Sequence, residues 1–265
     1  MANKVIVSSI QMDCVPYDKD ANLKRAEVLV ADAASKGSRL IVLPELFNTG
    51  YRVEDRDSEM AESIPGFTTQ WMCGLAQKHD AYLVAAIIEA AEDGTLYDTA
   101  LLVGPEGYIG KQRKMHLWGD EDKRFGRGSD IEVFQLPFAT VGLLICYEIG
   151  FPEMARVQTN KGADIIIYTS AFGSARYYVW DTASKSRALE NGVFVVASNR
   201  CGQELDTFFG GLSRVVAPDT TILASTGSQG DAVVCAEIDL DRVAVMRSTI
   251  PYLRDMNEKL YNRNF

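Results

Sequence analysis

Short apolar runs recur along the chain, and polar or glycine-containing turns separate them. They lie within residues 40–43, 140–145, 163–169 and 193–198. Runs of this length that are rich in Val and Ile are typical of strands buried on both faces. Between them, stretches with apolar residues on one side predict helices at 20–35, 68–78, 152–161 and 177–191. Alternating strands and helices joined by short links indicate an α/β fold with parallel strands.

A second pattern predicts antiparallel strands. Residues 82–90, 97–103 and 108–114 form a meander with a hairpin turn at Asp93-Gly94. Because this meander follows a parallel unit, the sheet is expected to be mixed. We also predict a surface loop at 54–62, one strand over 208–216, a first helix capped by Asp20 or Asn22, a last helix capped by Asp239, and an irregular tail. Residues 1–265 are interpreted as one domain with two helix-covered sheets.

Composition excludes several classes of function. A net charge of −9 argues against a nucleic-acid surface, and no stretch reaches 18 apolar residues, so no membrane span is expected. The N-terminal apolar run is too short for a signal peptide. Five scattered cysteines, none in a CxxC pair, fit a reducing compartment, which we interpret as the cytoplasm. With two histidines, a His/Cys metal site is not expected.

One cysteine stands at a structurally distinctive point. The apolar run at 141–145 stops at Cys146, and a turn with Gly150 leads to Pro152, where a helix could begin. Backbone N–H groups at a helix start favour a thiolate and can bind an oxyanion. A free cysteine is nevertheless usually a small buried hydrophobe. The local pattern leaves both readings open.

A nucleophilic thiol needs a base or a positive neighbour, because a free thiol is mostly protonated at neutral pH. The chain offers two routes. His116 could act as the base in a Cys–His pair. Alternatively Glu45, just past a predicted strand, could act as the base with Lys114 as its cationic partner. Singly, each of these residues could equally be an ordinary loop or surface side chain.

Three segments together resemble the nitrilase superfamily of carbon–nitrogen hydrolases. Residues 43–51 are similar to its glutamate motif, 113–118 to its lysine motif and 146–153 to its cysteine motif, in the same order and spacing. Further matching positions are Glu121, Phe125, Gly128, 187–191, Asn199, Gly211, Ser213 and 260–261. The resemblance therefore extends along the whole chain.

The resemblance implies a four-layer α-β-β-α sandwich with two mixed β-sheets. It also implies a triad of Glu45 as general base, Lys114 as electrostatic stabiliser and Cys146 as nucleophile, with Glu121 in a positioning role. Lys114 and the backbone N–H of Tyr147 would stabilise the oxyanion. His116 would then be structural, and neither a metal nor an organic cofactor would take part.

The expected reaction is hydrolysis of a small amide to a carboxylic acid and ammonia through a cysteine thioester. The chain lacks a long C-terminal extension and has Tyr147 after the cysteine, both of which favour an amidase over a nitrilase. The alternatives are an N-carbamoyl hydrolase, a nitrilase and, more distantly, a non-catalytic binding module of the same fold.

Motif adjacency suggests a substrate pocket and an interface. Tyr51, Trp118, Tyr147 and Phe172 are the candidates to line the pocket. Arg176 could hold a substrate carboxylate or could be a surface arginine. The partner is expected to be a small molecule, with no nucleic acid and no membrane. By the resemblance, a homodimer or higher homo-oligomer would form through residues 152–161 and 177–191.

Overall fold

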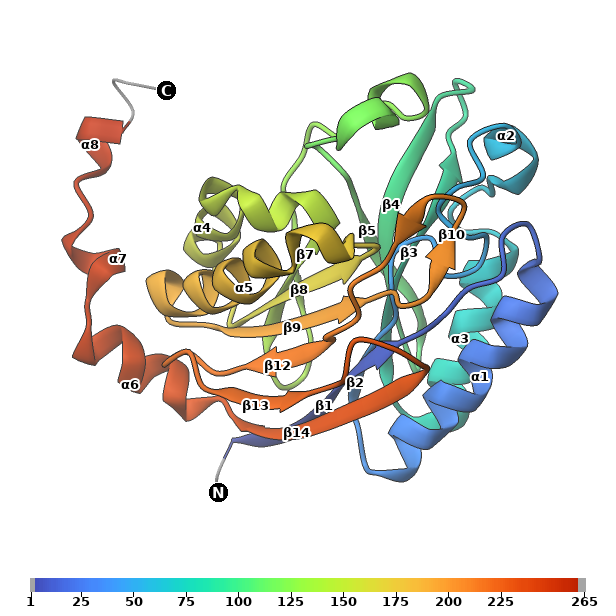
Figure 1. The fold of residues 1–265 in the computed structure, drawn as a ribbon. Helices are drawn as coiled ribbons and strands as arrows, with labels where there is room; N and C mark the ends of the chain where they lie inside the picture. The colour runs from blue at the N-terminus through green and yellow to red at the C-terminus, as the bar shows by residue number, and fades with distance from the viewer. Residues whose placement is uncertain (1–2, 262–265) are drawn as a thin grey trace.

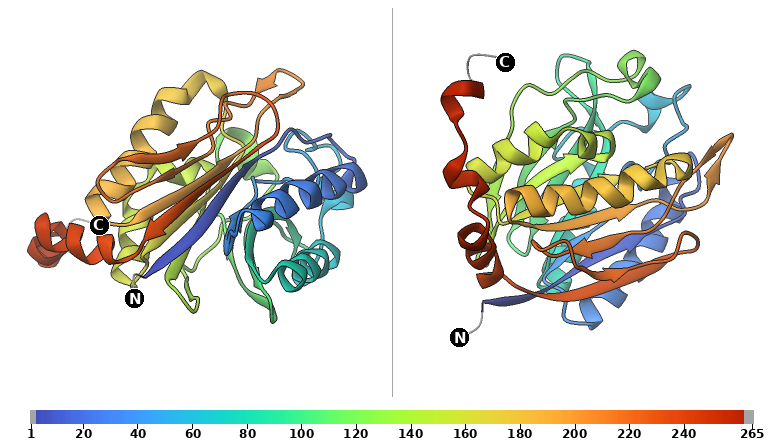
Figure 2. Two further views of the ribbon diagram at one scale, coloured as in Figure 1. Left: turned by 90° about the horizontal axis from the view of Figure 1, so that it is seen from below. Right: turned by 60° about the vertical axis from the view of Figure 1, so that its left-hand side comes forward.

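Two six-stranded sheets pack face to face, with helices on both outer surfaces (Figures 1 and 2). The computed structural model describes residues 3–261. The first sheet has the strand order β14-β1-β2-β3-β4-β5, and the second has the order β13-β12-β9-β8-β7-β6. Both sheets contain parallel and antiparallel pairs. The predicted α-β-β-α sandwich with two mixed sheets is confirmed.

The first sheet consists of β1 (Lys4–Gln11), β2 (Leu40–Val42), β3 (Tyr82–Ala90), β4 (Leu96–Gly104), β5 (Gly107–Arg113) and β14 (Ala232–Asp239). The second consists of β6 (Val133–Gln135), β7 (Thr140–Ile145), β8 (Ile165–Ser170), β9 (Phe194–Asn199), β12 (Arg214–Val216) and β13 (Ile222–Ser225). A small hairpin, β10 (Gln203–Glu204) and β11 (Thr207–Phe208), lies apart from both.

Helices α1 (Lys19–Ser35) and α3 (Phe67–His79) cover the first sheet, and α4 (Pro152–Asn160) and α5 (Tyr177–Asn191) cover the second (Figure 2). The short helices are α2 (Asp57–Met60), α6 (Asp241–Thr249), α7 (Tyr252–Asp255) and α8 (Glu258–Tyr261), with 3₁₀ turns η1 (Gly119–Lys123), η2 (Cys146–Gly150) and η3 (Ser174–Arg176). Among the described residues, no helix is both long and apolar enough to cross a bilayer.

The apolar runs are explained by burial on both faces of each strand. In β2, Leu40 and Val42 join the core between the sheets, whereas Ile41 joins the core beneath α1 and α3. Successive side chains of a strand point to opposite faces, so a strand with two covered faces needs apolar residues at every position. Because helices cover the outer face of each sheet, the inner strands are apolar at successive positions, without alternating polar residues.

The two sheets are linked by side-chain hydrogen bonds between their central strands. Ser9 Oγ on β1 donates to the Ala197 carbonyl on β9 at 2.8 Å. Ser198 Oγ on β9 donates in the opposite direction to the Ile10 carbonyl. All four residues are buried. These bonds fix how the sheets lie on each other, and so fix which strand ends meet.

Several predicted boundaries were wrong. Residues 208–216 are not one strand, because Gly210 and Gly211 carry the chain through a loop, where their N–H groups donate to Phe172 and Arg200 carbonyls. Residues 54–62 contain the short helix α2 rather than loop alone. The C-terminal tail contains α7 and α8 rather than irregular structure.

Two predicted helix caps were also wrong. Asp18 caps the first helix, where its carboxylate accepts from the Ala21 N–H at 2.9 Å. Helix α6 begins at Asp241, with Leu240 at the cap position, although the Asp239 carboxylate does accept from the Asp241 N–H at 3.1 Å. The first cap lies two residues before Asp20, and the second lies one residue after Asp239.

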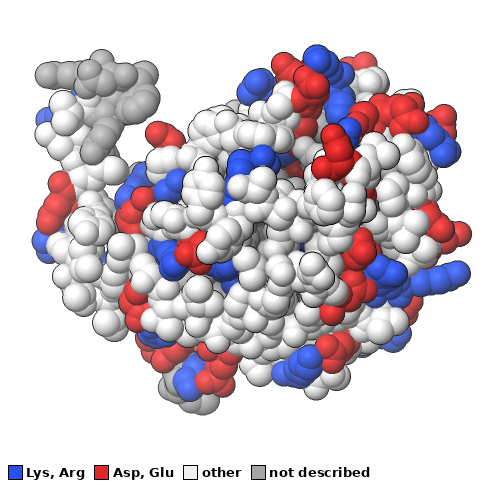
Figure 3. All heavy atoms as spheres, in the orientation of Figure 1, with Lys and Arg blue, Asp and Glu red and all other residues white. Residues whose placement is uncertain are grey.

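Charged side chains of both signs are interspersed on the face drawn in Figure 3. Basic residues there lie beside acidic ones, and the central part of the face is largely uncharged. Together with the net charge of −9, this distribution is unlike that of a surface that binds phosphates.

Candidate active site

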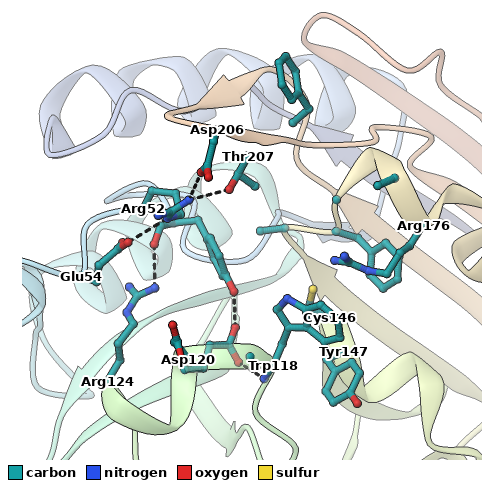
Figure 4. Close-up of a pocket in the computed structure, with 18 of the residues that line it drawn as sticks. Arg52, Glu54, Trp118, Asp120, Arg124, Cys146, Tyr147, Arg176, Asp206 and Thr207 are labelled. Carbon is teal, nitrogen blue, oxygen red and sulfur yellow. Dashed lines mark hydrogen bonds and ion pairs between the residues drawn. The ribbon is translucent and has the colours of Figure 1, made fainter.

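Cys146 lies where the chain makes its sharpest turn, between β7 and η2. Its φ of 46° is in the left-handed region, which is unfavourable for a residue with a Cβ. Such strain persists where the surrounding structure holds the residue in place, and it is found preferentially at functional sites. The buried thiol lies at the base of a pocket (Figure 4). The strand–turn–helix prediction is confirmed.

Residues from both sheets meet at this turn. Glu45 follows β2, Lys114 follows β5, and both are fully buried. Lys114 Nζ donates to Glu45 Oε1 at 2.6 Å, and the Cys146 thiol lies close enough to Glu45 for each group to shift the pKa of the other. The second Glu45 oxygen accepts from the Ala171 N–H at 2.6 Å, just past β8. The structure thus brings together the carboxylate, the ammonium and the thiol expected from separate motifs.

Two further carboxyl groups surround the Lys114 ammonium. Nζ lies 2.9 Å from Glu121 Oε1 and 3.2 Å from Asp98 Oδ2, and both acids are buried. An ammonium has three hydrogen atoms to donate, so these two acceptors and Glu45 use all of them. Burying a lone charge is costly, and this pairing is what makes a fully buried lysine tolerable.

The three carboxyl groups also have a spacing that could suit a metal ion. Oxygen atoms of Glu45, Asp98 and Glu121 all lie within 4.8 Å of one another. The Lys114 ammonium, however, is hydrogen-bonded to all three, so the cation at their centre is part of the chain itself. The donor set is therefore better explained as a lysine site than as a metal site.

Asp98 is the member of the cluster whose neutral form is favoured. Carboxyl oxygens of Asp98 and Glu45 lie within 4.8 Å of each other. Burial raises the pKa of Asp98 well above its ordinary value, and the nearby Glu45 charge adds to this effect against the opposing Lys114 charge. A neutral Asp98 therefore lies beside a charged Glu45.

Glu45 is held as a carboxylate. Burial by itself raises its pKa, but the Lys114 charge and hydrogen bonds from Asp98, Lys114 and Cys146 outweigh burial and lower it below the ordinary value. For Lys114, burial favours the neutral form, but the surrounding acids raise its pKa well above the usual range. At neutral pH the pair is therefore a carboxylate next to an ammonium.

The resting cysteine is a thiol, contrary to the expectation that N–H groups would favour a thiolate. Burial raises the pKa of Cys146 well above its ordinary value, and the negative charge of Glu45 raises it further, against the Lys114 charge. The effect of desolvation thus exceeds that of the helix start. A buried thiol in this state needs a base at the moment of attack, and Glu45 is the carboxylate whose charge acts on it most strongly.

Glu148, for which no role was predicted, connects the cysteine turn to the lysine loop. Its buried carboxylate accepts from the backbone N–H groups of Ile145 and Met115, each at 2.8 Å, and of His116 at 3.3 Å. Ile145 precedes the cysteine, and Met115 follows the lysine. Glu148 therefore sets the spacing between Cys146 and Lys114.

Replacing Glu148 with alanine should therefore weaken both the fold and turnover. Three backbone N–H groups, of which that of Ile145 is buried, would lose a charged acceptor, so we expect a loss of about 2–4 kcal/mol in the free energy of unfolding. Urea denaturation and steady-state kinetics measure the two effects. Glu148→Gln, which keeps one acceptor oxygen, should fall between the wild type and Glu148→Ala. Equal stability of all three proteins would contradict this role.

His116 contacts Glu148 rather than a member of the Glu45–Lys114–Cys146 triad. Its ring stacks on Phe151 with centroids 3.9 Å apart, and Nδ1 lies 3.7 Å from Glu148 Oε1. These contacts fit the structural role that the family resemblance implied.

The sequence analysis missed Asp98 and Glu148, although each left a signal in the sequence. Asp98 is a charged residue within a buried strand, and Glu148 is an acid two residues past the candidate nucleophile.

The pocket above Cys146 has a volume of about 690 Å³ (Figure 4). The aromatic candidates Tyr51, Trp118, Tyr147 and Phe172 all line it. Tyr51 also donates its hydroxyl to Glu121 Oε1 at 2.6 Å, which connects the pocket wall to the buried acids. Trp118 and Tyr147 lie edge to face with centroids 4.9 Å apart. A partly apolar small molecule would fit these walls.

Comparisons with known proteins agree with this geometry. Residues 6–248 match the family model described as carbon-nitrogen hydrolase. The chain is 38% identical over 263 residues to a nitrilase of Pyrococcus abyssi, with 98% of this chain and 97% of that protein covered. It is 34% identical over 274 residues to an omega-amidase of Xenopus laevis, with 98% and 97% covered.

The fold is similar to that of a solved nitrilase-superfamily structure, Nit3 of Saccharomyces cerevisiae. The TM-score is 0.88 at 30% sequence identity, with 99% of this chain and 97% of that chain covered. A family match over nearly the whole chain and relatives above 30% identity agree with the three motifs and with the convergence of Glu45, Lys114 and Cys146. The chain belongs to the carbon–nitrogen hydrolase family, within the nitrilase superfamily.

Proposed function

We propose that the protein hydrolyses a small linear amide to a carboxylic acid and ammonia, with Cys146 as nucleophile, Glu45 as general base and Lys114 as electrostatic stabiliser. The observation that carries this proposal is the buried cluster in which the Glu45 carboxylate is hydrogen-bonded to the Lys114 ammonium and lies beside the Cys146 thiol. A nucleophile, a base and a fixed positive charge are the elements that acyl transfer requires.

In the first step, Glu45 accepts the thiol proton as the sulfur of Cys146 attacks the amide carbonyl carbon. The carbonyl oxygen gains the negative charge. Lys114 Nζ and the Tyr147 N–H would stabilise that charge, because Tyr147 lies in the first turn of η2, where N–H groups lack a partner within the turn. Lys114 would act through its positive charge and Tyr147 through its N–H, and both groups are in place before the substrate binds, so little reorganisation is needed.

In the second step, the tetrahedral intermediate collapses and its C–N bond breaks. Glu45 returns its proton to the leaving nitrogen, so that ammonia departs and a thioester to Cys146 remains. Water then gives a proton to Glu45 and attacks the thioester carbon. Collapse of the second intermediate releases the carboxylic acid and returns the proton to the Cys146 sulfur, which restores the starting enzyme.

Glu121 and Asp98 act as positioning residues in this scheme. Glu121 bridges Lys114 and the Tyr51 hydroxyl, with a backbone bond from the Trp118 N–H at 2.7 Å. It thereby orients the ammonium relative to the pocket wall. The neutral Asp98 lies beside Glu45 and helps to keep that group ionised.

The pH profile should reflect the lowered pKa of Glu45. Glu45 must be ionised to take the thiol proton, so activity is present above its pKa and lost as the pH falls through it. Because that pKa lies below the ordinary 4.5, kcat/KM for a small amide should stay level from pH 8 to about pH 5. Circular dichroism at each pH separates acid unfolding from loss of the base. An acid limb centred near pH 6.5 would instead indicate a histidine base.

A screen for released ammonia tests the proposed reaction. Short aliphatic amides, ω-amides of dicarboxylic acids, N-carbamoyl compounds and nitriles would be compared at equal concentration. The omega-amidase relative supports amides, and the nitrilase relative keeps nitriles as the second candidate. We expect fastest release from amides. Release from nitriles alone would reject the amidase assignment, and no release from any class would favour a non-catalytic binding module.

We also propose that the protein forms a homodimer or higher homo-oligomer through α4 and α5. Tyr177 and Tyr178 at the start of α5 are 57% and 65% exposed, which is a large aromatic surface for a lone subunit. Analytical ultracentrifugation measures the assembly state.

We place the protein in the cytoplasm, because its five cysteines are all free, as expected in a reducing compartment.

A further inference from the structure

A buried ion pair lies behind the pocket wall and takes no part in the steps described above. Arg200 follows β9, Glu204 lies in β10, and both side chains are fully buried. Arg200 Nη2 contacts Glu204 Oε1 and also donates to the Cys14 carbonyl at 3.3 Å. A buried ion pair contributes little net stability relative to apolar residues of the same size, because both charges lose their hydration. The pair is therefore better explained by what its fixed carboxylate contacts.

Glu204 holds the backbone of the pocket wall at Tyr51. Its Oε2 accepts from the Tyr51 N–H at 2.9 Å and from the Arg52 N–H at 2.7 Å. The packing is tight at this point, because Gly50 has a φ of 88° and a side-chain carbon there would lie 3.0 Å from Glu204 Oε1. The carboxylate therefore leaves the backbone of this segment little room to shift.

The contact between this segment and the hairpin is reciprocal. The Arg52 guanidinium donates to Asp206 Oδ1 at 2.5 Å and to Thr207 Oγ1 at 2.9 Å (Figure 4). Both acceptors belong to the hairpin β10–β11, which pairs with neither of the two large sheets. Hydrogen bonds in both directions thus join the hairpin to the pocket wall.

Tyr51 connects this contact to the catalytic cluster. Its hydroxyl donates to Glu121 Oε1 at 2.6 Å, and the same oxygen accepts from Lys114 Nζ at 2.9 Å. Its ring meets Phe209 edge to face with centroids 6.1 Å apart, and the Arg200 guanidinium lies 4.5 Å from the Phe209 centroid. A shift of the Tyr51 backbone would therefore change the hydrogen bonds around the ammonium.

We propose that Glu204 is a positioning residue for the reaction. By holding the Tyr51 backbone, it keeps the Tyr51 hydroxyl bonded to Glu121, and Glu121 in turn orients the Lys114 ammonium. The inference rests on the amide hydrolysis proposed above. Because the ammonium acts on charge that develops during attack, its misplacement should lower kcat more than it raises KM.

Two double variants that differ only in one acceptor test this role. Arg200→Met/Glu204→Gln removes both charges and keeps an oxygen for the Tyr51 N–H, whereas Arg200→Met/Glu204→Leu removes that oxygen. Neither leaves a lone buried charge, and thermal unfolding checks that both fold. With the amide that the ammonia screen ranks first, the first variant should keep kcat within about threefold, and the second should lose about 10- to 100-fold. Glu89→Gln alters another buried glutamate that pairs with an arginine, and it should leave kcat unchanged.

Tyr51→Phe separates positioning from a general loss of stability. This change keeps the backbone contact and removes only the hydroxyl, so kcat should again fall by about 10- to 100-fold. In the Tyr51→Phe background, the two double variants should differ by less than about threefold, because the same hydrogen bond is already lost. Wild-type kcat in Tyr51→Phe, or losses that multiply in the combined variants, would overturn the positioning role while leaving amide hydrolysis intact.

Hydrogen exchange provides a readout that needs no turnover. The N–H groups of Tyr51 and Arg52 should exchange about 10-fold or more faster in Arg200→Met/Glu204→Leu than in Arg200→Met/Glu204→Gln, because only the first of these lacks the acceptor. Equal exchange in the two proteins would overturn the inference even if no amide were hydrolysed. Faster exchange in a protein that hydrolyses no amide would support the contact and reject the proposed function alone.

Discussion

Replacing Cys146 with alanine is expected to abolish amide hydrolysis and leave the fold intact. The proposed thioester needs the sulfur, and no other group in the buried cluster can take its place, because Glu45, Asp98 and Glu121 are all engaged with Lys114. Loss of a nucleophile that works with a base typically costs about 10⁴-fold or more in kcat. Ammonia release with the enzyme in excess over the substrate, a single-turnover assay, measures the residual rate.

Another cysteine provides the matched control. Cys73→Ala makes the same chemical change on α3, away from the pocket, and should retain full activity. Thermal unfolding of both variants checks that alanine is tolerated at each position. If Cys146→Ala kept more than about 1% of the wild-type rate, the nucleophile would have to be another group.

Replacing Lys114 with alanine is expected to damage both stability and catalysis. Three buried carboxyl groups share its ammonium at 2.6, 2.9 and 3.2 Å. Without that charge they would remain buried without a counter-ion, which costs about 3–5 kcal/mol for a broken buried pair. The pKa of Glu45 would also rise, since the Lys114 charge is the main factor that lowers it. At neutral pH the base would then be partly protonated, in addition to the loss of oxyanion stabilisation.

An exposed ion pair distinguishes this effect from a general cost of losing a lysine. Lys4 pairs with Glu237 at 2.7 Å, but both side chains are about half exposed. Lys4→Ala should therefore leave the free energy of unfolding almost unchanged. Urea denaturation of the two variants gives the comparison. A Lys114→Ala protein as stable and active as the wild type would rule out the triad.

The sequence predicted the layers of the fold and the three motif residues. Buried strands such as β2 and β7 are short apolar runs that periodicity detects directly. The convergence of Glu45, Lys114 and Cys146 came from the family resemblance, because spacing along one chain does not show which strand ends of two sheets meet. Family membership confirms the predicted class of enzyme, a carbon–nitrogen hydrolase acting through a cysteine.

Properties that depend on burial could not be predicted from the sequence. The helix start predicted after Cys146 suggested an activated thiolate, yet desolvation keeps the group protonated. Asp98 looked like one polar residue in a strand, and only its burial next to Glu45 favours its neutral form. Glu148 acts on backbone N–H groups from two separate segments, which no local pattern brings together.

Trapping the acyl-enzyme tests the central claim most directly. The enzyme would be mixed with a substrate amide, quenched in acid within milliseconds, digested and analysed by mass spectrometry. We predict an added mass equal to the amide minus ammonia on the peptide that contains Cys146, formed before the free acid and lost as the acid appears. Steady turnover with no adduct on that peptide, or with the adduct on another residue, would contradict the thioester mechanism.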